Sequence, residues 1–293
     1  MQPNRLVYTL IFLLFLSFSV SAQEDLLAEL DTEEKAYPVT STFKGTRLIS
    51  GHTVKMLDQG VLDFVISHRF GRVNEGAEEF FGLDNAQIRL GLEYGITDFF
   101  TIGIGRSSFQ KVLDGYAKAR ILEQKSSGMP ISLVAFGSIA SKTGDGAFYD
   151  VTVDHETKHR LYYTAQLLAA RKFSSKFSAQ LAPIWVHRNL VQFADDPNDV
   201  FALGVGARYK VTNRIAINAE WYPQLVDRVD GYYDALSVGV DIETGGHVFQ
   251  IHLTNSRSMI EEGFVSETTG TWSKGDIHIG FNISRVFDLS PKK

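Results

Sequence analysis

Hydrophobic and polar residues alternate strictly along much of this chain. In the stretch AQIRLGLEYGIT, which begins at Ala86, one set of alternate positions is apolar: Ile88, Leu90, Leu92 and Tyr94. The positions between them carry polar side chains or glycine: Gln87, Arg89, Gly91 and Glu93. A period of two residues places successive side chains on opposite faces, which is the geometry of a β-strand with one apolar face.

About twelve segments share this pattern, and each has about the ten residues that a tilted strand needs to cross a bilayer. They lie near residues 60–69, 86–94, 99–108, 114–122, 131–140, 159–171, 177–187, 201–211, 214–223, 233–243, 246–255 and 276–287. We therefore predict an all-β fold, a transmembrane outer-membrane β-barrel of about 12 antiparallel strands.

The connections between these segments alternate in length. Tight turns follow the second, sixth, eighth and tenth segments, with the sequences GITDF, FSSK, TNR and TGG. Long polar loops follow the first, fifth, seventh and eleventh segments, at residues 70–85, 141–158, 188–200 and 256–275. Tight turns on one side, long loops on the other and an even strand number are the layout of outer-membrane barrels. This layout puts both termini in the periplasm.

Aromatic residues collect near both ends of the apolar faces when the strands run alternately up and down. The outer ends carry Tyr163, Trp185, Phe201 and Trp221. The inner ends carry Tyr94, Phe100, Phe177, Tyr209 and Phe287. Outer-membrane barrels have such aromatic belts at the two membrane–water interfaces, so we predict that outer-membrane lipid surrounds the chain.

The N-terminus predicts export. Arg5 precedes an apolar run at 6–18, and the small residues at 20–22 form a cleavage site, as in a secretory signal peptide. The chain has no Cys, which argues against a disulfide scaffold or a thiolate metal site. Its net charge of −5 argues against nucleic acid as a partner. No later run of about 18 apolar residues predicts a membrane helix.

Four stretches resemble an uncharacterised family of Gram-negative outer-membrane β-barrel proteins: TFKGTRLISGH, GVLDFVISHRFGRVNEG, FFGLDNAQIRLGLEYGITDFFTIGIGRSSF and YTAQLLAARKFSSKFSAQLAPIWVHRN. The resemblance runs from about residue 42 to residue 287. It implies the barrel and its location in the outer membrane. It implies no reaction, ligand or catalytic residue.

Residues His155 to His159 read HETKH, the letters of a zinc-peptidase motif. That motif needs a helix, so that its two histidines share a face and hold the metal. The flanking sequences, DVTVD and RLYYTAQLL, are instead rich in β-forming residues, and no histidine cluster downstream offers a third ligand. We therefore interpret the motif as loop residues and predict no metal site.

Other candidate motifs are equally weak. The loop SKTGDGAFYD and its continuation carry three carboxylates without the EF-hand spacing of a calcium site: Asp145, Asp150 and Asp154. A barrel hydrolase would need a Ser–His pair at its rim. Ser67 with His68, and Ser256 or Ser258, are candidates for such roles, but adjacent residues of a strand point to opposite faces. We predict no enzyme activity, no catalytic residue and no cofactor.

The inward-facing rows carry interleaved charges of both signs. The lumen-lining candidates are Asp63, Arg89, Glu93, Lys118, Arg120, Arg208, Glu220, Asp241, His252 and His278. In a wide pore these groups would line water and select solutes, whereas in a narrow barrel they would pair across the lumen and close it. Twelve strands lie between packed eight-stranded barrels and open sixteen-stranded porins, so size leaves both alternatives open.

The organisation we predict is a signal peptide at 1–22, a lead segment at 23–58, the barrel at 59–288 and a short tail at 289–293. The lead segment mixes apolar residues with basic ones: Lys44, Arg47, His52 and Lys55. It is too short to fold alone. One hypothesis is that it folds into the lumen as a plug, with its basic side chains meeting Glu93, Glu220 or Asp241. The alternative is a periplasmic linker.

The function we predict is passive passage or binding of small polar or charged solutes. The second hypothesis is a closed barrel that anchors or docks an envelope complex, and a hydrolase at the rim is the third. In each case we expect the barrel-assembly machinery as a partner, with envelope proteins added under the second hypothesis.

Overall fold

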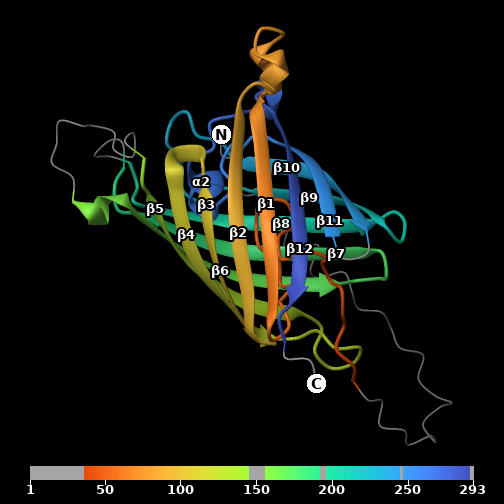
Figure 1. The fold of residues 1–293 in the computed structure, drawn as a ribbon. Coiled ribbons are helices and arrows are strands. Elements are labelled where there is room, and N and C mark those ends of the chain that lie inside the picture. The colour runs from red at the N-terminus through yellow and green to blue at the C-terminus, as the bar shows by residue number, and fades with distance from the viewer. Residues whose placement is uncertain (1–35, 145–155, 192–195, 245–246, 291–293) are drawn as a thin grey trace, which may run out of the picture. The chain divides into compact units, whose positions relative to one another are not determined.

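The computed structural model describes residues 36–144, 156–191, 196–244 and 247–290, which form a closed barrel of twelve antiparallel strands (Figure 1). Strands that are consecutive in the chain pair with each other, and β1 pairs with β12 to close the ring. Closure leaves no open sheet edge. The strands are β1 (Val61–Arg72), β2 (Ala86–Thr97), β3 (Phe100–Ser107), β4 (Val112–Leu122), β5 (Ser132–Lys142), β6 (Leu161–Lys172), β7 (Phe177–Arg188), β8 (Asp199–Lys210), β9 (Ile215–Tyr222), β10 (Ala235–Thr244), β11 (His247–Thr254) and β12 (His278–Asp288).

The two-residue alternation determines which side of each strand faces outward. On β2, Leu90 and Leu92 are 44% and 42% exposed on the outer face, whereas Arg89 and Glu93 are each 1% exposed on the inner face. The predicted fold class and strand number are therefore confirmed. The observed strand ends differ from the predicted ones by up to three residues. The largest differences are at the ends of β1 and β2, where backbone pairing continues to Arg72 and Thr97.

The connections separate into two ends of the barrel. Short connections such as residues 98–99, 173–176 and 211–214 occupy what we call the turn end. The opposite, loop end carries short helices: η1 (Val73–Glu75), η2 (Phe80–Gly82), η3 (Phe109–Lys111), η5 (Thr157–Arg160), α2 (Glu261–Ser266) and η6 (Trp272–Lys274). Within the described ranges, no helix is long and apolar enough to span a membrane.

Several predicted features lie outside the described residues. They are the signal peptide at 1–22, residues 23–35 of the lead segment, the last residues of the tail, and four loop positions: Asp145, Asp150, Asp154 and His155.

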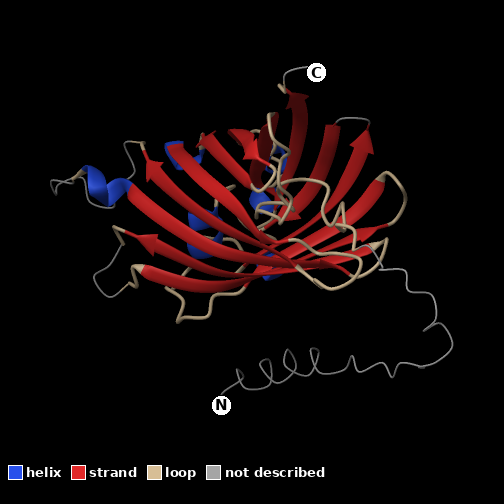
Figure 2. Cartoon of the chain, turned by 90° about the horizontal axis from the view of Figure 1, so that it is seen from below, coloured by secondary structure: helices blue, strands red, loops and turns tan. Residues whose placement is uncertain are grey.

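The hydrophobic core lies inside the barrel. Inner residues of β5 to β8, such as Val134, Leu168 and Ile184, pack in one cluster with side chains of the lead segment and of α2. Figure 2 looks along the barrel and shows loop and helical segments inside the ring of strands. The lead segment and α2 of the same chain therefore fill the lumen.

Candidate functional site

The described part of the lead segment, residues 36–58, enters the lumen. Tyr37 at its start is 65% exposed, whereas five apolar side chains further along are almost completely buried: Phe43, Leu48, Ile49, Val54 and Leu57. The chain makes a tight turn between Arg47 and His52, which form a β-bridge, and the Leu48 N–H donates to the Gly51 carbonyl at 2.8 Å. Glycine is needed at position 51 because a Cβ atom there would collide with the Tyr222 hydroxyl.

One carboxylate of the wall binds the tip of this turn. Glu220, on β9, accepts hydrogen bonds from the backbone N–H groups of Ile49, Ser50 and Gly51 at 3.2, 2.7 and 3.3 Å. The Tyr222 hydroxyl donates to the same carboxylate at 3.2 Å. Consecutive backbone N–H groups that converge on an anion give strong, charge-assisted hydrogen bonds. Glu220 therefore holds the segment in the middle of the lumen.

Amide and ammonium groups of the wall bind the rest of the segment. Gln180 accepts from the Val54 N–H at 3.0 Å and donates to the His52 carbonyl at 2.8 Å. Three more wall side chains donate to backbone carbonyls of the segment: Gln250 to Leu48 at 2.5 Å, Asn282 to Ile49 at 2.8 Å and Lys118 to Lys55 at 2.6 Å. Polar side chains from around the barrel thus satisfy the backbone of a segment that has no sheet of its own.

Two basic side chains of the segment form ion pairs with carboxylates other than the predicted ones. Lys44 Nζ lies 3.1 Å from Glu243 Oε2 on β10, and Arg47 Nη1 lies 3.9 Å from Glu261 Oε1 on α2. The prediction that named Glu93, Glu220 or Asp241 differs from these contacts, and backbone N–H groups, not a basic side chain, bind Glu220. For Arg47 it differs because α2 brings Glu261 into the lumen, and the alternation pattern gives no sign of that. For Lys44 the partner is Glu243, two positions beyond the predicted Asp241 on β10.

His52 is enclosed by aromatic rings inside the lumen. Its ring centroid lies 4.5 Å from that of Tyr116 and 4.6 Å from that of Phe136. Its Nε2 atom lies 3.9 Å from Glu261 Oε1, which is too long for a hydrogen bond. Burial lowers the pKa of His52 well below its ordinary value, and Arg47 lowers it further. The imidazole is therefore neutral at pH 7.

The loop between β11 and β12 fills the lumen from the other end. All six residues of α2 are buried, and Phe264 packs against Tyr222 with ring centroids 4.7 Å apart. Lys142 on β5 binds Glu267, just after α2, at 2.7 Å. The sequence predicts a long polar loop here, and the structure differs. The signal for its burial is two apolar pairs within the loop, Met259-Ile260 and Phe264-Val265.

Nine of the ten lumen-lining candidates have buried side chains: Asp63, Arg89, Glu93, Lys118, Arg208, Glu220, Asp241, His252 and His278. Arg120 differs, because it lies near the turn end with 27% of its side chain exposed and pairs with Glu123 at 2.7 Å. Two of the buried cations bind wall carboxylates, since Arg89 binds Asp114 at 2.9 Å and Arg208 binds Glu243 at 2.6 Å.

A small cavity remains between the lead segment and the wall. It has a volume of about 30 Å³ and is lined by Arg47 and by side chains of β10, β11 and β12, among them Asp241, Gln250 and Asn282. A cavity of this size holds about one or two water molecules and no larger solute.

The residues of the predicted aromatic belts are on the outer face, in two groups. At the turn end, Phe177 pairs with Tyr209 across neighbouring strands, and Tyr94, Phe100 and Phe287 also lie near this end. Toward the loop end, Trp185 pairs with Phe201, while Tyr163 and Trp221 lie on β6 and β9. Trp185 also donates its indole N–H to Asp199 at 2.7 Å.

The residues considered for catalysis do not come together. Ser67 is buried inside, whereas His68 stacks on Phe281 with ring centroids 4.7 Å apart and planes 4° from parallel. His159 lies in the short helix η5, where its Nδ1 accepts from the Glu156 N–H at 3.1 Å. In the described ranges no group of three His, Cys, Asp or Glu side chains could hold a metal ion.

A protein-family model described as membrane bound beta barrel domain (DUF5777) matches residues 43–287. The chain belongs to this family. The match begins within the lead segment, so the family's membrane-bound barrel domain includes the part of the segment that fills the lumen. No curated protein sequence matches the chain.

Three solved barrels are similar to the chain. The NanC porin is 8% identical, with a TM-score of 0.49 and coverage of 78% of this chain and 100% of that one. An outer-membrane channel from Pseudomonas putida F1 is 14% identical, with a TM-score of 0.47 and coverage of 80% and 97%. Outer membrane phospholipase A from Escherichia coli is 9% identical, with a TM-score of 0.43 and coverage of 78% and 93%. These values carry no argument about function, which has to come from the chain's own residues.

Proposed function

We propose that the protein is an outer-membrane channel for small polar or charged solutes, closed at rest by the lead segment. The observation that carries the proposal is the way Glu220 and its polar neighbours hold the backbone of residues 48–55. A segment held by hydrogen bonds to polar groups can exchange them for water when it leaves, because the net free energy of each bond is small. The charged wall behind it is already suited to line water.

The second candidate is a closed barrel that anchors or docks an envelope complex. The hydrophobic cluster inside the barrel favours it, since Phe43 and Leu48 of the segment and Phe264 of α2 pack against inner residues of β5 to β8. Removing such side chains from contact exposes apolar surface to water, which opposes opening. The two candidates differ in whether the segment ever leaves the lumen.

Single-channel conductance in a planar bilayer tests the proposal. The chain from residue 23 onward is compared with a variant that lacks residues 24–56, and both are first shown to be folded by circular dichroism and resistance to heat in detergent. We expect a closed state with rare openings for the longer protein and steady openings for the deletion variant.

A deletion of residues 24–35 alone is the matched control, because it shortens the chain and keeps the part of the segment that fills the lumen. It should behave as the longer protein. Silence from a folded and inserted deletion of residues 24–56 would mean that the lumen stays closed without the segment, with α2 still inside it, and would favour the closed anchor. Steady openings of the undeleted protein would mean that the segment does not close it.

A further inference from the structure

The described part of the lead segment, residues 36–58, is cationic, and the lumen around it supplies carboxylates. Apart from histidine, the charged side chains at 36–58 are Lys44, Arg47, Lys55 and Asp58. Lys44 pairs with Glu243 at 3.1 Å and Arg47 with Glu261 at 3.9 Å. Glu243 belongs to the wall and also binds Arg208 at 2.6 Å, whereas Glu261 belongs to α2, and among the described residues Arg47 is its nearest cation.

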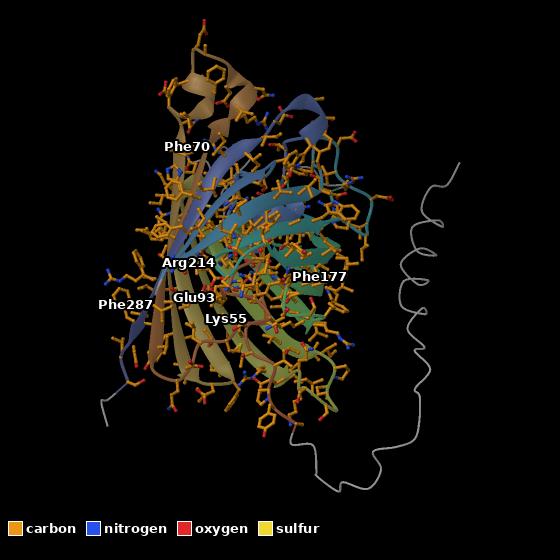
Figure 3. All side chains as sticks on the ribbon, turned by 90° about the vertical axis from the view of Figure 1, so that its right-hand side faces the viewer. Lys55, Phe70, Glu93, Phe177, Arg214 and Phe287 are labelled. Carbon is orange, nitrogen blue, oxygen red and sulfur yellow. The ribbon has the colours of Figure 1, made fainter. Side chains whose placement is uncertain are left out.

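The third cation, Lys55, lies near two carboxylates that face each other. Asp63 on β1 and Glu93 on β2 are direct cross-strand partners on the inner face, 3% and 1% exposed. Among the described residues, neither oxygen of Glu93 has a hydrogen-bond partner, and neither does Asp63 Oδ1. The Lys55 carbonyl accepts from Lys118, and Figure 3 shows Lys55 and Glu93 at a similar height in the barrel. Facing like charges destabilise a strand pair, so this pair favours a cation beside it.

Some cations of the wall bind carboxylates that the lead segment does not contact. Arg89 binds Asp114 through two N–H groups, and Lys142 binds both oxygens of Glu267 at 2.9 and 2.7 Å. These pairs do not involve the lead segment and persist when it leaves. When the lead segment leaves the lumen, three acidic positions lose a partner. Glu220 loses the backbone N–H groups of residues 49–51, Glu261 loses Arg47, and the Asp63–Glu93 pair loses Lys55.

When the lead segment leaves, two cations of the wall lose hydrogen-bond acceptors that carry no charge. Lys118 loses the Lys55 carbonyl, and Arg69 loses the Ser50 hydroxyl, which accepts from it at 3.2 Å. The vacated lumen therefore keeps charges of both signs. Arg208 still binds Glu243 at 2.6 Å, and wall cations stay near the other acidic positions: Lys118 near Glu93, Arg69 near Glu220 and Arg89 near Glu261. The carboxylates that lose a cation of the segment without keeping an ion pair of their own are Glu261 and the Asp63–Glu93 pair.

We propose that the open lumen selects cations and binds linear organic cations of the diamine and polyamine class. Their ammonium groups take the positions that Arg47 and Lys55 hold in the closed state, beside Glu261 and the Asp63–Glu93 pair. The inference rests on the proposed channel function. An ammonium is a compact charge with three donors, which suits single carboxylates spaced along a passage. A hard metal ion needs several oxygen ligands converging on one point, and none of the described carboxylates are grouped in that way.

Amines of this class compete with the lead segment for the same carboxylates, which gives a test on the undeleted protein. The chain from residue 23 onward is reconstituted in detergent, and trypsin cleavage at Lys44, Arg47 and Lys55 is followed by mass spectrometry. Spermidine at millimolar concentration should speed cleavage by roughly threefold or more, because a ligand that binds only the opened state raises its population by mass action.

Three controls separate competition from other effects. Potassium chloride at equal ionic strength and 1,8-octanediol at equal concentration should leave the rate unchanged. A free peptide of residues 36–58 measures any direct effect of spermidine on trypsin. An equal acceleration by potassium chloride, or none by spermidine, overturns the proposal.

Variants locate the site. Asp63→Asn combined with Glu93→Gln, and separately Glu261→Gln, should each reduce the effect of spermidine by at least about twofold, since each removes charge that the amine binds. Glu79→Gln, on the exposed β1–β2 loop, is the matched control and should keep the full effect. An undiminished effect in both lumen variants means that spermidine acts elsewhere and overturns the assignment.

Conductance distinguishes this inference from the channel function on which it rests. In a potassium chloride gradient, openings of the undeleted protein should reverse toward the potassium equilibrium potential. Openings that are unselective or select chloride overturn the cation site and leave the channel standing. Cleavage that responds to spermidine in a barrel that never conducts overturns the channel and leaves the cation site standing.

Discussion

At the scale of single residues, the contact between Glu220 and the turn at 48–51 decides where the lead segment lies. The carboxylate is 1% exposed and accepts from three consecutive backbone N–H groups. Burying a carboxylate without hydrogen-bond partners costs free energy, and these N–H groups supply partners for Glu220. The turn and the carboxylate therefore depend on each other.

Glu220→Gln tests that dependence. The amide keeps one oxygen acceptor but brings an NH₂ group toward backbone N–H donors, so we expect a loss of roughly 1–3 kcal/mol in unfolding free energy. We also expect more frequent openings in the bilayer. Urea unfolding in detergent gives the first quantity, with the exposed Glu79→Gln as control, and equal midpoints for the two variants would contradict this account.

Glu262 gives a prediction about pH. Burial, followed by the neighbouring Asp114, raises its pKa to about 8. The folded protein therefore holds a proton that the unfolded chain releases, so this group's contribution to stability falls as pH rises from about 4.5 to about 8. We expect Glu262→Gln, which does not titrate, to be close to the parent at pH 5 and more stable than it at pH 9. Thermal unfolding at both values checks this, and a difference independent of pH would contradict it.

At the scale of elements, α2 is fixed in the lumen by apolar contacts. Phe264 is 0% exposed, and its ring packs against Tyr222. We expect Phe264→Ala to cost about 3–5 kcal/mol and to release the β11–β12 loop from the lumen. Limited proteolysis of residues 255–277 measures the release. Phe80→Ala is the control, because Phe80 is 59% exposed on η2, and a similar loss there would remove the basis of the prediction.

The strands could be predicted from the sequence, whereas the filling of the lumen could be predicted only in part. Alternation is local, so Leu90 and Arg89 reveal their opposite faces without knowledge of any other strand. Partners inside the lumen come from distant parts of the chain. The sequence indicates that Arg47 needs a carboxylate partner, but nothing near it in sequence identifies Glu261. That residue lies 214 positions later and contacts Arg47 only because the β11–β12 loop folds into the lumen.

At the scale of the whole molecule, the free-energy cost of placing a charge on the outer surface should depend on how deep in the membrane the position lies. Ile104, in the middle of β3, is 60% exposed on the outer face. Lysine there should cost about 2–4 kcal/mol, because the charge enters the hydrocarbon of the bilayer. Refolding into lipid vesicles measures the cost. Val211→Lys, in the β8–β9 turn, is the matched control and should cost little, so equal costs would argue against this membrane placement.

The seam between β1 and β12 has a consequence for assembly. The lead segment directly precedes β1, and the loop that carries α2 directly precedes β12, so both contents of the lumen are attached to the two strands that close the ring. Before β1 and β12 pair, the lead segment and the α2 loop can enter the lumen laterally through the open seam. Neither has to be threaded into a closed barrel. Pairing of β1 with β12, the contact that spans the most chain, then locks the contents in place.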